Sequence, residues 1–171
     1  MGNEARIVGT MQYYEAGETW QVSGLTYRMM KPKDPGNIQK LSTGHQPAWV
    51  PTTPDAFLHG KVTIQGEETS QVFDYAQMAV ATSIEMKDLF VESIYTTLDE
   101  ESSSRGAMTL TCKAGDEIIQ VRTAVLYDEN RALITQDKYL GKVIDVKGSV
   151  DYFEGQYQIK VFRPSDITIH Q

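Results

Sequence analysis

Cysteine, long apolar runs and surplus positive charge are all scarce in this sequence, and each scarcity excludes a class of protein. Cys112 is the only cysteine among the 171 residues, which excludes an intramolecular disulfide and any zinc site built from several cysteines. No stretch is long and apolar enough to span a bilayer, so we expect no membrane insertion by this segment. The formal net charge of −7 disfavours general binding to phosphate backbones.

Motifs that mark common active sites are also missing. The sequence has no nucleophile elbow, no His-Glu-x-x-His zinc motif and no glycine-rich phosphate loop. His45, His59 and His170 lie far apart, and no two of them have metal-ligand spacing on one element. We therefore predict no catalytic residue, no metal and no cofactor, and we expect that the chain is not an enzyme.

The C-terminal half has a regular pattern of strands. Five alternating runs, bounded by turn residues, predict a first strand, a hairpin, a polar connector and a second hairpin; they span residues 89–98, 107–113, 117–126, 142–153 and 156–162. Five strands with a connector between the third and fourth are typical of the OB-type Greek-key barrel. The fold class predicted for residues 88–171 is therefore all-β, with this barrel.

Alternation along the strands also predicts which side chains fill the barrel. Val143, Val150, Ile159 and Val161 are expected to point inward, and Gly148 is where the fourth strand would bend. Cys112 lies in an alternating run and is expected to be a small buried side chain.

Residues 1–87 are predicted to form a smaller N-terminal β unit. A hairpin is expected at residues 6–27, followed by a proline-rich loop at 28–54 with a short helical turn at 37–41. Residues 58–65 predict a short strand. Residues 73–86 fit either a helical face or a strand, and we favour the strand because the segment runs into the next one.

Two segments repeat the same order of residue types. Residues 9–22 and 148–159 both read glycine, hydroxyl, apolar, polar, tyrosine, aromatic and glutamate before a glycine turn. Shared hairpin chemistry is one explanation. The other is that the first segment closes a second, partial OB-like unit. The remaining strands of that unit would then be absent from this chain or supplied by residues 58–84.

The strongest resemblance lies in residues 126–130, 139–148 and 151–161. The strands Gly-Lys-Val-Ile-Asp-Val-Lys-Gly and Gln-Tyr-Gln-Ile-Lys-Val carry it. They resemble the OB-fold modules of exported multidomain proteins and lipoproteins of Gram-positive and related bacteria. The resemblance implies an extracellular or cell-surface setting in a multidomain protein, and we expect contacts with other domains of the parent protein or a cell-surface partner. Strand-like sequence begins almost directly after residues 1–6, which suggests that an export signal has been removed upstream. It transfers no catalytic residue.

An OB barrel binds on the face of its second and third strands, between the first and last loops. Six candidate ligand contacts follow, namely Lys113, Gln120, Arg122, Tyr152, Phe153 and Tyr157. The opposing interpretation is that the aromatic rings are core and the cations are solvated. We predict a non-catalytic binding or interaction module of a larger exported bacterial protein. The alternative is an OB domain that binds single-stranded nucleic acid or an oligosaccharide and assists an attached enzyme.

Overall fold

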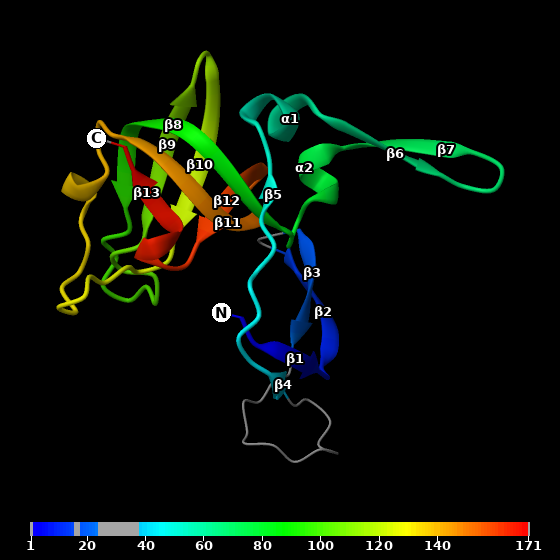
Figure 1. The fold of residues 1–171 in the computed structure, drawn as a ribbon, viewed down its shortest axis with the longest axis horizontal. Helices are drawn as coiled ribbons and strands as arrows, with labels where there is room; N and C mark the ends of the chain where they lie inside the picture. Colours follow the sequence, from blue (N-terminus) through cyan, green and yellow to red (C-terminus); the bar gives the residue numbers. More distant parts are fainter. Residues whose placement is uncertain (1, 16–17, 24–37, 171) are drawn as a thin grey trace. The chain divides into compact units, whose positions relative to one another are not determined.

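Five strands in the C-terminal half of the chain close into a β-barrel (Figure 1). They are β8 (Ser83–Thr96), β9 (Met108–Ala114), β10 (Glu117–Thr123), β11 (Val143–Phe153) and β12 (Gln156–Val161). The order β11-β12-β10-β9-β8 becomes a ring because β8 also pairs with β11. The β10–β12 pair is parallel, whereas β8–β9, β9–β10 and β8–β11 are antiparallel. The predicted closed five-stranded barrel is thus confirmed.

The structure is a computed structural model that describes residues 2–15, 18–23 and 38–170. These residues divide into two compact units. The first contains Met1–Ala48 with Tyr152–Glu154, and the second contains Trp49–Asp151 with Gly155–Gln171. This division differs from the predicted boundary between residues 87 and 88, because residues 49–87 group with the barrel. Within the described part of the chain, no helix has both the length and the apolar character needed to cross a bilayer.

Alternate side chains of the strands fill the barrel, as the period of two in a β-strand requires. Leu110, Cys112, Val121, Ile159 and Val161 are fully buried. Burial raises the pKa of the Cys112 thiol to about 12, because the thiolate loses its hydration there. The prediction of a buried Cys112 is confirmed.

In β11 the even-numbered residues face the core. Ile144, Val146 and Val150 are buried, while Val143 is only half-buried, so the prediction that Val143 fills the barrel was wrong by one position. Gly148 lies in the same inward row. A Cβ atom there would come within 2.6 Å of Ile159 Cγ2 and 2.7 Å of the Lys160 carbonyl oxygen. Glycine therefore lets β11 and β12 approach closely, as expected for a tight barrel bend.

Two short strands pair with the edges of barrel strands. β13 (Ile167–Ile169) pairs antiparallel with β11, and β5 (Val50–Pro51) pairs parallel with β8. The 3-10 helix η3 (Pro164–Asp166) precedes β13, and Arg163 forms a two-pronged ion pair with the buried Asp166. The connector between β10 and β11 carries η2 (Gln136–Lys138), which places Tyr139 in the core.

Residues 54–78 form two short helices that flank a hairpin. α1 (Pro54–His59) is capped by Thr53, whose hydroxyl accepts a hydrogen bond from the Ala56 amide. The strands β6 (Lys61–Gln65) and β7 (Ser70–Asp74) pair only with each other, and α2 (Tyr75–Met78) follows. The predicted strand at residues 58–65 is therefore shortened at its start by α1. The strand favoured for residues 73–86 was wrong over α2, where the helical alternative is correct.

The first unit consists of two strand pairs. β1 (Glu4–Ile7) pairs with β4 (Ile38–Ser42), and β2 (Thr10–Tyr14) pairs with β3 (Thr19–Ser23). The hairpin predicted within residues 6–27 is present as β2–β3, and Tyr13 packs against Trp20 across it with ring centroids 5.6 Å apart. The helical turn predicted at 37–41 was wrong for residues 38–41, which are extended. Residues 16–17 and 24–37 of these predicted segments lie outside the described residues.

Candidate ligand-binding face

The outer surface of β8, β9 and β10 carries a row of polar side chains in register. Tyr95 of β8 lies opposite Thr109 of β9, and Thr109 lies opposite Arg122 of β10. The next row places Thr111 opposite Gln120, with 3.4 Å between the Thr111 hydroxyl and the Gln120 carbonyl oxygen. Since the alternate residues of these strands fill the core, these side chains point outward. We call them, with Thr97, the polar face.

Arg122 is the best-positioned charge on the polar face. Its Nη1 donates to Thr109 Oγ1 at 3.0 Å, and its Nη2 donates to Thr97 Oγ1 at 3.0 Å. Partial burial lowers the Arg122 pKa, and the Tyr95 hydroxyl opposes that shift. A guanidinium has about five N–H donors. Arg122 is therefore held rigidly by its two threonine contacts, and further donors remain for a ligand.

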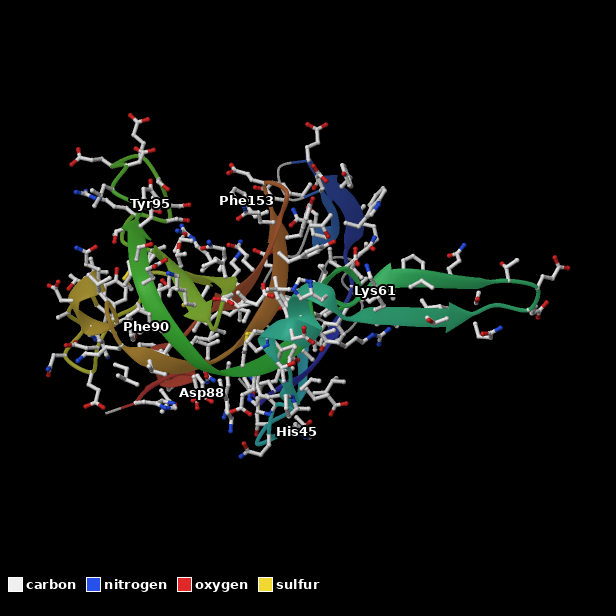
Figure 2. All side chains as sticks on the ribbon, turned by 90° about the horizontal axis from the view of Figure 1, so that it is seen from above. His45, Lys61, Asp88, Phe90, Tyr95 and Phe153 are labelled. Carbon is white, nitrogen blue, oxygen red and sulfur yellow. The ribbon has the colours of Figure 1, made fainter. Side chains whose placement is uncertain are left out.

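An exposed aromatic ring borders this arginine. The Tyr95 residue is 66% exposed, and Leu98 beyond the end of β8 is also well exposed. Figure 2 shows Tyr95 toward one end of β8, beside the loop that leads to β9. An exposed ring in the same cross-strand row as a hydrogen-bonded guanidinium suits a planar or ring-shaped ligand, because rings stack on aromatic faces.

A groove of about 370 Å³ adjoins the polar face. It lies between the two helices and the strands β10 and β12, and its lining residues are Phe57, Leu58, Asp74, Ala76, Ile118, Gln120, Gln156 and Tyr157. The ion pair between His59 Nε2 and Glu117 Oε1, 2.8 Å apart, joins α1 to β10 beside it. Hydrogen bonding to Glu117 raises the His59 pKa, which favours the charged imidazole. Two of the predicted contacts, Gln120 and Tyr157, share this groove.

The other predicted contacts are less well placed. Lys113 forms an ion pair with Glu92, which reduces its use as a free cation. Tyr152 and Phe153 end β11 and group with the first compact unit, so the polar face is built without them. The structure therefore brings together Gln120, Arg122 and Tyr157 of the six candidates in the barrel unit. Tyr157 also packs against the core, as the opposing interpretation held for some of the aromatic residues.

Sequence reasoning missed Tyr95, Thr97 and Thr109. Their roles depend on the register between β8 and β9, which contains a bulge near Val91 and Ser93. A bulge changes which residues point outward beyond it. Alternation counted from Leu89, where the predicted strand begins, places Tyr95 on the same face as the buried Val91, so it could not locate Tyr95 on the outer surface.

One set of side chains could hold a metal ion. Among the described residues, Asp88, Asp145 and His170 form such a group, with one ligand atom from each lying within 4.8 Å of the others. They come from β8, from β11 and from the residue after β13. Spacing within a single element could not reveal them, because the barrel brings three distant segments together.

The described part of the chain therefore offers a rigid polar face, an adjoining groove and one group of metal-ligand type. No family model matches the chain, and the search of curated proteins finds no match.

Proposed function

We propose that this chain is a non-catalytic binding module with an OB-type Greek-key barrel, part of a larger exported bacterial protein, and that the polar face holds its ligand. The topology supports the OB assignment. A three-stranded meander is followed by a connector and a hairpin, and the ring is completed by a parallel β10–β12 pair and an antiparallel β8–β11 pair. OB barrels bind on the face that here corresponds to β9 and β10.

The observation that carries this proposal is the row Tyr95–Thr109–Arg122. Arg122 is fixed by hydrogen bonds to two threonines, so little side-chain entropy is lost when it binds a ligand. Such preorganisation of a half-buried charged side chain is what a binding site needs.

The charge of the chain favours a neutral, hydroxyl-rich ligand such as an oligosaccharide over nucleic acid. Asp99, Glu100 and Glu101 follow β8 close to Tyr95 in sequence, and Arg105 pairs with Glu100 at 3.3 Å. These carboxylates repel a phosphate backbone, whose binding depends on clustered cations. Sugar rings, by contrast, stack on an exposed tyrosine and accept hydrogen bonds from a guanidinium.

The resemblance of β11 and β12 to exported modules supports the cell-surface setting. The partner would then be another domain of the parent protein, a surface protein or a glycan. The match between residues 9–22 and 148–159 supports a second, partial OB-like unit around β2–β3.

The test is a screen of neutral and acidic glycans, followed by titration of the hits by calorimetry with Tyr95→Ala and Arg122→Lys. We expect Tyr95→Ala to cost about 1–3 kcal/mol of binding free energy, taking as the guide the worth of a nucleobase stacked on an aromatic side chain. Arg122→Lys keeps the charge but loses the planar fork, so it should also weaken binding. Tyr127→Ala is the matched control, since Tyr127 is an exposed tyrosine of the β10–β11 connector.

Equal affinity in the two face variants and the control would refute the proposed site. Single-stranded oligonucleotides form the second arm of the experiment. The proposal predicts no retention on a polyanion column at moderate salt. Oligonucleotide binding in low salt that Tyr95→Ala weakens would instead establish the nucleic-acid alternative.

A further inference from the structure

Asp88, Asp145 and His170 are held together by the backbone of three strands. The amide of His170 donates to the Val143 carbonyl at 2.9 Å, which fixes the end of β13 against β11. The amide of Asp88 donates to Asp145 Oδ1 at 3.0 Å, at a bulge in β8. Figure 2 shows Asp88 well removed from Tyr95 along the same strand. The group is therefore independent of the polar face.

The imidazole of His170 is oriented by one carboxylate toward the other. Its Nε2 lies 2.8 Å from Asp145 Oδ1, so Nε2 carries the proton and donates it to that carboxylate. Its Nδ1 then faces Asp88 Oδ1 at 3.8 Å, which is too long for a hydrogen bond. Two ligands of a tetrahedral metal, each bonded at about 2.0–2.2 Å, lie roughly 3.4 Å apart. The gap is thus close to the spacing of two ligands that share an ion.

This arrangement matches the way proteins hold metal-binding histidines. A ligating histidine almost always donates its second ring N–H to a carboxylate, a backbone carbonyl or water, which fixes the ring and raises its basicity. Asp145 does this for His170 and is itself only 21% exposed at its side chain. In the neutral ring, the Nδ1 lone pair and the Asp88 carboxylate face each other as two acceptors. A cation between them removes that repulsion.

We propose that His170 Nδ1 and the Asp88 carboxylate bind a divalent cation of the zinc class, with Asp145 orienting the ring and water completing the coordination. The mixed nitrogen and oxygen donors favour Zn²⁺ over Mg²⁺ or Ca²⁺, which prefer oxygen ligands alone. The bound ion ties the C-terminal strand to the β8 bulge. Binding of the ion therefore stabilises the folded chain.

The test is calorimetric titration of the full chain with Zn²⁺ and, separately, with Mg²⁺. We expect one saturable Zn²⁺ site, weaker Mg²⁺ binding, and a melting temperature that rises with Zn²⁺ concentration because only the folded chain has the site. Asp88→Asn is the sharpest variant. Asp88 has a φ of +58°, and asparagine adopts this left-handed region as readily as aspartate. The variant therefore removes the charge without straining the backbone.

We expect Asp88→Asn and His170→Ala to lower Zn²⁺ affinity at least as much as Asp145→Asn, for which the loss of a carboxylate behind a ligating histidine predicts about 10–100-fold. His59→Ala is the matched control, since His59 is an exposed histidine paired with a single carboxylate, and it should bind as wild type does. Circular dichroism checks that each variant is folded.

The proposed site would be overturned if His59→Ala lowered the Zn²⁺ affinity as much as Asp88→Asn does. So would a wild-type titration without saturable heat, which would leave the three side chains as a charged hydrogen-bond network only. Titration of wild type followed by the His170 ring resonances in NMR spectra gives an answer that needs no variant. A shift of the Nδ1 resonance on addition of Zn²⁺ is expected, and its absence contradicts the proposal. Loss of glycan binding has no bearing on this result.

Discussion

The barrel and the β6–β7 hairpin are built from the same kind of alternating strand, yet they differ completely in burial. Ile159 of β12 is fully buried, whereas Ile64 of β6 is 44% exposed and Val72 of β7 is 63% exposed. Both regions have regular ladders, parallel between β10 and β12 and antiparallel between β6 and β7. The difference teaches that strand-forming sequence alone does not determine stability. A strand contributes when a second layer or a closed ring covers one of its faces.

The largest expected effect comes from the same substitution made in both regions. Ile159→Ala should lower the free energy of unfolding by about 2–5 kcal/mol, because it leaves a cavity inside the closed barrel. Ile64→Ala should change it by only about 0.5 kcal/mol, since solvent already reaches this side chain. Urea denaturation of both variants measures the difference. Equal losses would mean that the hairpin is covered in solution and would break the comparison.

A second effect concerns how tightly the barrel is packed. Gly148→Ala inserts a methyl group where Ile159 and Lys160 leave no room, so we expect a loss of about 1–3 kcal/mol in unfolding free energy. Ser149→Ala, at the adjacent outward position, is the control and should be close to neutral. If the glycine variant is as stable as wild type by the same denaturation assay, the close approach of β11 and β12 does not restrict the chain.

A third effect is the pH dependence that burial gives Cys112. Its pKa is about 12 in the folded chain, above the roughly 8.5 of a free thiol, so the folded state keeps the proton longer. This contribution to stability is complete below about pH 8.5 and is lost as pH rises toward 12. The difference in unfolding free energy between wild type and Cys112→Ala should therefore shrink between pH 7 and pH 10.

Thiol alkylation checks the same burial directly. Iodoacetamide at pH 8 should leave folded Cys112 unmodified and should alkylate it in urea. Rapid modification of the folded protein would show that the barrel opens easily and that its core differs less from the exposed hairpin than the structure indicates.

The smallest effect lies in the surface pair that joins α1 to β10. Hydrogen bonding to Glu117 raises the His59 pKa, so Glu117→Gln should lower it toward the usual value near 6.5. With a raised pKa, any stabilisation by the pair is present at acid pH and is lost as pH rises through the folded pKa. Proton NMR titration of the ring measures the shift. His45, whose ring lies in the first unit, serves as the internal reference.

Sequence patterns located the barrel strands well and the surface elements poorly. The strands around Leu110, Val121 and Ile159 alternate over long runs, and turn residues bound them, so their positions were readable. α1 and α2 were not, because a helix of four to six residues has too few positions to show a period. For β4, pairing with β1 overrode the helical propensity on which the predicted turn was based. This pairing is a tertiary contact, and it cannot be predicted from the sequence of the β4 segment alone.

The candidate site divides in the same way. Arg122 and Gln120 were readable because the barrel order indicated the binding strands. Tyr95 and the group of Asp88, Asp145 and His170 were not readable. Each depends on register between strands or on three segments that meet only after folding, and bulges in β8 shift that register.

The pairing of β8 with β11 has a consequence for how the chain folds. Phe90 lies opposite Val143 and Ile84 opposite Gly148, so the seam of the barrel joins segments that are far apart in sequence. Bringing them together costs loop-closure entropy before any stabilising contact is made. All-β chains dominated by such distant pairings fold on the order of milliseconds to seconds. The two hairpins of the barrel, β9–β10 and β11–β12, are therefore expected to form early. The β8–β11 pairing is expected to form last, as the rate-limiting step.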